Sequence, residues 1–232
     1  MKKTILYSII SFFIMTNIGF AKTEVILGIS AKSGSLQYTT AEDFTKTANK
    51  MCGSKCEVKF FGNSQLGSDK ELMSKLKLGS VHLALPSSMM SSIVAEAGLF
   101  DMPFIVKDRN HVRAIEKNVF WPDIHPKIQD KGYTVIGFWE NGVRHITNSK
   151  RPIDKPSDLK GLKIRTPKST WRVKMFKAWG SSPTPMAFNE VFTALQTGVI
   201  DGQENPYTNV AGAKFQEVQK FLSKTGHVYT PA

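Results

Sequence analysis

The side chains of this 232-residue chain that could do chemistry gather between positions 158 and 209. Arg165 follows a predicted strand, Leu162–Ile164, and stands directly before the turn Thr166-Pro167. A guanidinium held at a strand end can bind a carboxylate through two parallel, charge-assisted hydrogen bonds. A salt bridge between two parts of the fold is the alternative role for Arg165.

Acid–base catalysis is the competing chemistry in the same stretch. Asp201 and Glu204 could form a pair of carboxylates, although such residues in a tight turn also cap the helix that follows. The sequence has no G-x-S-x-G, H-E-x-x-H, phosphate-loop or G-x-G-x-x-G motif. The histidines are widely separated along the chain: His82, His111, His125, His145 and His227. We therefore expect no enzymatic activity, no metal site and no cofactor.

Two strand–helix units must position these residues. A helix pattern follows the turn after Arg165 and ends at Gly180. A second helix is expected over Asn189–Thr197, with Asn189 as its N-cap, and a strand over Val199–Asp201 then enters the polar turn 202–206. Ligands of open α/β sheets lie beyond the carboxyl ends of the strands, so both units present polar residues where a ligand is expected.

The N-terminal part of the chain predicts a parallel sheet. A strand over Val25–Ile29, a helix opening at the capping-box pattern Thr40–Asp43 and a strand over Glu57–Phe61 form a β-α-β start. A second capping box, Ser68–Glu71, precedes a strand over Val81–Leu85. The remaining expected elements are helices over about 89–97, from 108, over 122–131 and over 206–222, and strands over 133–139, 144–147 and 225–229.

The segments LKGLKIRTP and GSSPTPMAFNEVFTALQTGVIDGQENP resemble the signature of the substrate-binding proteins of tripartite ATP-independent periplasmic (TRAP) transporters. Weaker similarity runs through NGVRHITNS, FDMPFIV and GNSQLGSDKELMSKLKLGSVHLA. The resemblance implies an α/β, two-lobed periplasmic-binding-protein-like fold, each lobe a mostly parallel sheet with flanking helices. The ligand cleft would lie between lobe I, residues 22–141, and lobe II, residues 142–232.

The resemblance also implies roles for four residues. Arg165 would clamp the substrate carboxylate, Arg144 would help to hold the acid, Asn205 would contact the carboxylate or a neighbouring hydroxyl, and Phe188 would line the pocket. The alternatives are a surface charge for Arg144, a helix N-cap for Asn205 and core packing for Phe188.

Ser87 and Ser88 follow the third expected strand, whose end faces the cleft in the resembled family. They are candidate hydroxyl donors to a ligand, and capping of the next helix is the alternative. The sequence around them has no carboxylate or arginine, which leaves the chemistry at the far end of the ligand open.

The resemblance implies a function in transport. The protein would capture an organic acid in the periplasm and deliver it to the membrane permease subunits of a TRAP-type transporter. Two alternatives are a solute receptor for a sensor protein and an exported hydrolase using Asp201 and Glu204.

Residues 1–21 are typical of a secretory signal peptide. Lys2 and Lys3 precede an apolar run over Ile5–Ile14, and Gly19-Phe20-Ala21 is a small-x-small cleavage pattern. A membrane anchor is the alternative, but the run is short and polar residues interrupt it. We expect a periplasmic, exported product.

The chain is basic, with a formal net charge of +12. Removal of Lys2 and Lys3 with the signal peptide would leave +10 (12 − 2). The lysines are scattered among acidic residues and form no stripe with aromatic residues, so nucleic acid is not expected as a partner. A basic surface favours small anionic ligands.

Cys52 and Cys56 are the only cysteines. An even pair in an exported protein indicates a structural disulfide, and metal binding is the alternative. At the other end of the chain, members of the resembled family continue beyond position 232, return to the first lobe and add a long helix. Without that part, we expect uncovered apolar faces and low stability.

Overall fold

The computed structural model describes residues 22–232. The predicted signal peptide, residues 1–21, lies outside the described residues. No helix in the described part of the chain is long and apolar enough to cross a membrane.

The first sheet has three parallel strands in the order β2-β1-β3. Its strands are β1 (Thr23–Gly28), β2 (Cys56–Phe61) and β3 (Leu83–Ala84). Helix α1 (Leu36–Cys52) packs on this sheet through an apolar cluster that includes Ala41 and Val58. The predicted β-α-β start is therefore confirmed.

The two predicted capping boxes differ in outcome. Helix α2 (Asp69–Lys77) has the predicted box, in which the Glu71 carboxylate accepts from the Ser68 backbone N–H at 2.7 Å. The box at Thr40 is wrong, because α1 begins four residues earlier and the Ser35 hydroxyl caps it. Thr40 lies inside the helix, where its hydroxyl donates to the Leu36 carbonyl at 2.8 Å.

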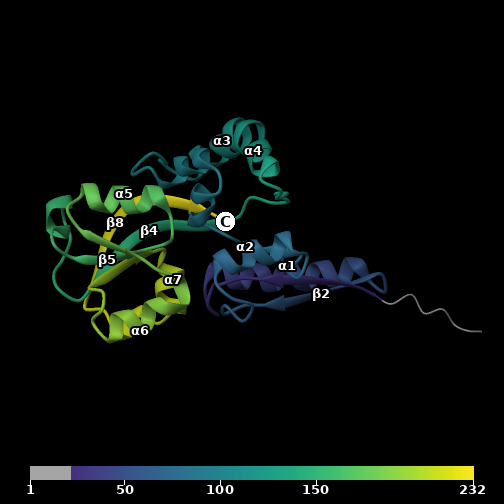
Figure 1. The fold of residues 1–232 in the computed structure, drawn as a ribbon, viewed down its shortest axis with the longest axis horizontal. Helices are drawn as coiled ribbons and strands as arrows, with labels where there is room; N and C mark the ends of the chain where they lie inside the picture. The colour runs from purple at the N-terminus through teal and green to yellow at the C-terminus, as the bar shows by residue number, and fades with distance from the viewer. Residues whose placement is uncertain (1–21) are drawn as a thin grey trace, which may run out of the picture.

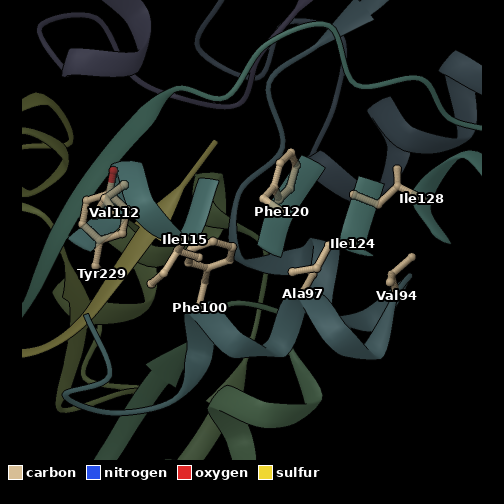
Figure 2. Packing of buried hydrophobic residues seen from close by; sticks show 9 residues of the cluster. All are labelled: Val94, Ala97, Phe100, Val112, Ile115, Phe120, Ile124, Ile128 and Tyr229. Atoms are coloured by element: carbon tan, nitrogen blue, oxygen red, sulfur yellow. The ribbon is translucent and has the colours of Figure 1, made fainter. Parts of the chain in front are cut away.

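A helical segment connects the two sheets. It comprises η1 (Ser88–Ser92), η2 (Ala95–Asp101), α3 (Arg109–Ile115), the π-helical η3 (Glu116–Ile124) and α4 (His125–Asp130). Figure 2 shows the apolar side chains of these segments converging on one another, with Tyr229 at one end of the cluster. The helix predicted over 89–97 is thus two 3₁₀ segments.

The strand predicted over 133–139 is wrong. These residues form an irregular connection, in which Tyr133, Val135 and Phe138 pack against the apolar cluster of the helical segment. These residues therefore contact the helices instead of pairing in a sheet.

The second sheet has five strands in the order β6-β5-β7-β4-β8. Strand β5 pairs in parallel with β6 and β7, whereas β4 pairs antiparallel with β7 and β8. The strands are β4 (Glu140–Asn148), β5 (Lys163–Thr166), β6 (Ser182–Pro185), β7 (Gly202–Asn205) and β8 (Phe221–Pro231).

Helices cover both faces of the second sheet. Figure 1 shows α5 (Thr170–Ala178) on one side, and α6 (Val191–Gln196) and α7 (Tyr207–Gly212) on the other. The predicted cap of α6 by Asn189 is wrong, because a 3₁₀ turn, η5 (Phe188–Glu190), leads directly into the helix. Gly180 follows α5 with a φ of 82°, as expected for a residue that ends a helix.

The strand predicted over Val199–Asp201 is also wrong, because the ladder begins at Gly202. A Cβ atom on Gly202 would lie 2.3 Å from the Thr147 carbonyl oxygen, so only glycine lets β7 approach β4 this closely. Glu204 and Asn205 are consequently strand residues with fixed backbones. Arg165 likewise lies within β5 and not beyond its end.

A disulfide joins Cys52, the last residue of α1, to Cys56, the first residue of β2. Cys56 pairs with Thr23 at the beginning of β1. The bridge therefore lies at the end of the first sheet opposite to the carboxyl ends of its strands.

Candidate functional site

Two hollows in the described structure are candidates for a ligand site. The larger has a volume of about 450 Å³ and lies between the first sheet and the helical segment, with Leu83, Phe138 and the terminal residues Thr230–Ala232 among its lining. No arginine or lysine lines it. An anionic ligand would find no counter-charge there, so this hollow does not fit an organic acid.

The smaller hollow, of about 40 Å³, is polar. It lies between residues that adjoin the first sheet and residues of the second sheet. All six residues singled out from the sequence line it: Ser87, Ser88, Arg144, Arg165, Phe188 and Asn205. We call it the polar cavity.

Arg165 is a buried cation with an incompletely used guanidinium. Its Nε and Nη2 atoms both donate to the Met186 carbonyl, at 3.1 and 2.7 Å, and its Cζ atom lies 5.9 Å from the centre of the Phe188 ring. Nη1 makes no hydrogen bond to any residue between 22 and 232, and no carboxylate lies within ion-pair distance. Arg165 therefore does not form the salt bridge that was its alternative role.

The charge of Arg165 survives its burial. Only 3% of the residue is exposed. Burial lowers the pKa of its guanidinium to about 10, opposed by the nearby Glu204 carboxylate. Arg165 is therefore protonated at neutral pH and presents a cationic N–H donor at the wall of the polar cavity.

Arg144 is also buried, which excludes the surface-charge alternative. Its Nε and Nη2 atoms bind the two carboxylate oxygens of Glu204, and Nη2 also donates to the Asn205 side-chain oxygen at 3.0 Å. Nη1 reaches the Thr230 hydroxyl at 3.3 Å. Glu204 thus neutralises Arg144, and Arg144 in turn orients Asn205 on β7.

Asn205 lies within the sheet and caps no helix, because Pro206 occupies the N-cap position of α7. Its amide nitrogen donates to the Gln203 side-chain oxygen at 2.6 Å. Asn209, four residues later in α7, also lines the polar cavity. Its side-chain oxygen is buried without a hydrogen-bond partner in the described structure. A buried acceptor of this kind fits a donor from a ligand.

The two serines are not equivalent. The Ser87 hydroxyl donates to the Pro231 carbonyl at 3.0 Å and accepts from the Asn141 amide at 2.8 Å. Ser87 precedes η1 but makes no side-chain cap bond to it. The Ser88 hydroxyl makes no hydrogen bond within residues 22–232 and lines the polar cavity. Ser88 is therefore the serine with a donor to spare.

The wall near the serines does carry a carboxylate, contrary to the expectation from the sequence. Asp69, the first residue of α2, lines the polar cavity and accepts a hydrogen bond from the Ser30 hydroxyl at 2.6 Å. Burial raises the pKa of Asp69, while Ser30 and Arg165 oppose the shift. Asp69 is remote from Ser87 in sequence, and only the packing of α2 beside β3 brings it into this wall.

Glu204 is the centre of a buried ion network that the sequence did not reveal. The completely buried Arg172 binds Glu204 at 2.7 Å and Asp101 at 2.6 Å. Although burial alone would raise the pKa of Glu204, Arg144 and Arg172 hold it well below its usual range. His227 contacts the same carboxylate at 3.3 Å.

This network leaves no oxygen of Glu204 free for acid–base chemistry. Asp201 is occupied elsewhere, accepting from the Lys163 backbone N–H at 2.9 Å. The described structure therefore does not place these two carboxylates in a hydrolytic arrangement. Within residues 22–232, no cluster of three or more His, Cys, Asp or Glu side chains could hold a metal ion.

Comparisons with known proteins agree with this architecture. Residues 27–232 match the model of the family described as bacterial extracellular solute-binding protein, family 7 (DctP). A solute-binding protein of Verminephrobacter eiseniae is 40% identical over 213 residues, covering 91% of this chain and 64% of that protein. The 2,3-diketo-L-gulonate-binding periplasmic protein of Escherichia coli is 37% identical over 196 residues, covering 84% of this chain and 60% of that protein.

Solved structures extend the similarity to the fold. A TRAP periplasmic solute-binding protein from a Polaromonas species, bound to D-erythronate, has a TM-score of 0.86 and 38% identity, with 90% of this chain and 70% of that chain covered. The corresponding protein of Sulfurospirillum deleyianum, with bound succinate, gives 0.87 and 36%, with 91% and 68% covered.

The predicted α/β fold of TRAP binding proteins is thereby confirmed. The chain spans 60–64% of the length of the two curated relatives named above. The match over residues 27–232, together with these relatives, establishes that the chain belongs to the DctP family of bacterial extracellular solute-binding proteins.

Proposed function

We propose that this protein captures an organic acid by its carboxylate and delivers it to the membrane subunits of a TRAP-type transporter. The similar proteins support the ligand class, because the names and structures above refer to 2,3-diketo-L-gulonate, D-erythronate and succinate, all of which are carboxylates. Capture without turnover agrees with a site in which Glu204 has no free oxygen.

The unpaired Nη1 of Arg165 is the observation that carries the proposal. A buried, protonated guanidinium without an ion-pair partner is costly unless a counter-charge arrives. A ligand carboxylate is the natural counter-charge, since it accepts charge-assisted hydrogen bonds from a guanidinium. Asn205 and Phe188 lie in the same wall, the first as an oriented amide and the second as an apolar face beside Arg165.

Ligand entry requires the walls of the polar cavity to part. A volume of about 40 Å³ suits about one water molecule and no organic acid. We assign the walls to two lobes, residues 22–141 and 142–232, that open to admit the acid and close over it. The acid stabilises the closed state because only that state offers contacts from both walls.

Export belongs to the same proposal. Residues 1–21 would direct the chain to the periplasm, where it meets its ligand and the transporter. The membership of an extracellular solute-binding family supports this placement.

Native mass spectrometry of the exported protein tests the proposed function. The spectrum should show the protein with an adduct whose mass equals that of an organic acid, and Arg165→Ala should lose the adduct. Uptake of that acid into proteoliposomes that hold the membrane subunits should depend on the protein. Ligand binding without uptake, but with binding to a sensor protein, would favour the receptor function instead.

A further inference from the structure

The two walls of the polar cavity also meet outside it, where helix α7 approaches the turn that precedes α1. Gly212 is the last residue of α7, and the turn consists of residues 33–35. A Cβ atom on Gly212 would lie 3.0 Å from the Ser33 carbonyl oxygen and 3.1 Å from the Ser35 backbone nitrogen. Contacts of Cβ atoms are rarely this short, so a side chain at position 212 would force α7 and the turn apart. We call this approach the Gly212 contact.

The backbone conformation of Gly212 does not require glycine. The residue lies within a helix, and its φ is not positive. Glycine is less favourable than alanine in a helix, because it loses more conformational freedom on folding. The residue that does require glycine is the one that another backbone approaches closely, and the Gly212 contact is such an approach.

Hydrogen bonds fix the turn opposite Gly212. The Ser33 backbone N–H donates to the Asn63 side-chain oxygen at 2.9 Å. The Ser35 hydroxyl donates to the Lys32 carbonyl at 2.7 Å, and the same hydroxyl caps α1. A shift of the turn alone would break these bonds. A side chain at position 212 is therefore expected to increase the distance between the two lobes instead.

The Gly212 contact is adjacent to the polar cavity. Asn209, three residues before Gly212, and Gln37, three residues after Gly34, both line the cavity. Gly212 itself does not line it. A larger distance between α7 and the turn would therefore move Asn209 away from Gln37. A ligand between them would then lose contacts with one of the two walls.

We propose that Gly212 is a positioning residue for lobe closure, because its missing side chain lets α7 reach the turn at residues 33–35. The proposal rests on the proposed function, since it concerns closure on an acid, and it adds a residue that controls affinity from outside the cavity. The apparent affinity of a ligand falls when the closed, binding-competent state is less populated. A side chain at position 212 acts in this way, without touching the ligand.

Gly212→Ala and Gly212→Val test the proposal by adding one and three carbon atoms at the contact. Titration calorimetry of the exported protein uses the acids D-erythronate, succinate and 2,3-diketo-L-gulonate as probes. For each acid that binds the natural protein, Gly212→Val should weaken binding at least about tenfold, and Gly212→Ala by a smaller factor. The melting temperature of the ligand-free protein should not fall in Gly212→Ala, because alanine favours the helix.

Ala211→Val is the matched control. It places the same side chain in the same helix, one position earlier, where the residue is exposed. Its effect on helix propensity is comparable, but it adds nothing to the Gly212 contact. The affinity of Ala211→Val for each acid should therefore equal that of the natural protein.

Double electron–electron resonance separates incomplete closure from local damage to α7. Spin labels on Lys46→Cys in α1 and Gln196→Cys in α6, both at exposed positions, report the distance between the lobes. A saturating acid should shorten this distance in the natural protein. In Gly212→Val the distance should remain longer at saturation.

The outcomes distinguish this inference from the proposed function. Natural affinity in the folded Gly212→Ala and Gly212→Val variants would overturn the inference and leave capture of an organic acid intact. Equal weakening by Ala211→Val, or full shortening of the label distance in Gly212→Val, would also overturn it. Should Gly212→Val fail to fold, Gly212→Ala decides. Binding of none of the acids by the folded natural protein would contradict both.

Discussion

At the scale of single residues, three buried arginines have different tasks. Arg144 and Arg172 are held by Glu204, whereas the Nη1 atom of Arg165 has no hydrogen-bond partner among residues 22–232. The motif around Arg165 pointed to a carboxylate clamp from the sequence. Asp69, Arg172 and Asn209 could not be predicted in the same way, because their contacts depend on segments that meet only in the folded molecule.

Glu204→Gln should lower the free energy of unfolding substantially. It should change the direct contacts of the ligand little. The substitution leaves Arg144 and Arg172 buried without their shared anion. Breaking a buried ion network in this way costs about 3–5 kcal/mol. Urea unfolding followed by tryptophan fluorescence should show a lower midpoint, and Glu190→Gln, at an exposed position, serves as the matched control. An unchanged midpoint would contradict the importance of the network.

The lowered pKa of Glu204 predicts how the free energy of unfolding depends on pH. Because the pKa of Glu204 is lower in the folded state than its unfolded value of about 4.3, its contribution is present above that value and is lost as the pH falls below it. Burial also lowers the pKa of His227. Its protonation therefore lowers the free energy of unfolding further as the pH falls below its unfolded pKa of about 6.5. The free energy of unfolding should therefore decrease on acidification, with a smaller decrease below pH 5 in Glu204→Gln. Equal decreases in both proteins would argue against this assignment.

At the scale of elements, β7 shows why a polar strand is difficult to predict. Val199 and Ile200 are the apolar residues of the strand predicted over Val199–Asp201. In the structure, however, Val199 is exposed and Ile200 packs with α6 and α7. The ladder instead uses Gly202–Asn205, whose buried polar side chains find partners on β4, α5 and β8. The local sequence of Gly202–Asn205 favours a turn. The hydrogen bonds of the folded sheet stabilise it as a strand instead.

Gly202→Ala tests the close approach of β7 to β4. The new Cβ atom would clash with the Thr147 carbonyl, so the strands must separate. We expect a loss of stability of about 1–3 kcal/mol and weaker ligand binding, because Asn205 is carried on the same strand. Thermal melting and calorimetry measure the two effects. An unaltered melting temperature and affinity would show that a Cβ atom fits between β7 and β4.

The disulfide should matter for stability and not for the ligand. Cys52 and Cys56 close a short loop, for which chain entropy gives about 2 kcal/mol. The bridge lies at the far end of the first sheet from Ser30 and Asp69. A Cys52→Ser, Cys56→Ser double variant should melt at a modestly lower temperature with unchanged affinity. A large change in affinity would contradict the purely structural role.

At the scale of the whole molecule, the parallel start and the α/β class followed from the order of predicted elements, and the two-lobed arrangement from family resemblance. The order of the second sheet did not follow, because β4 lies between β7 and β8, which come much later in the chain. Pairing between remote strands leaves little signal in local patterns. The strand predicted over 133–139 is absent for another reason, because these residues pack against the helical segment instead of pairing in a sheet.

The large apolar hollow predicts a surface property of the 232-residue chain. Its lining includes the apolar side chains of Leu83, Val135, Phe138 and Trp139. The folded protein should enhance the fluorescence of the neutral apolar dye Nile red, and unfolding in guanidinium should abolish the signal. Leu222→Ser, which removes an exposed apolar side chain elsewhere, should leave it unchanged. Absence of any enhancement would show that the hollow is covered in solution.

The central claim is that Arg165 binds the carboxylate of the ligand, and a double-mutant cycle tests it most directly. Calorimetry would compare the bound acid and its neutral carboxamide, each with the natural protein and with Arg165→Ala. The account predicts that Arg165→Ala weakens binding of the acid by about 2–5 kcal/mol, roughly 30-fold to several thousand-fold, but hardly affects the carboxamide. Equal losses for both ligands, or no loss for the acid, would contradict the claim.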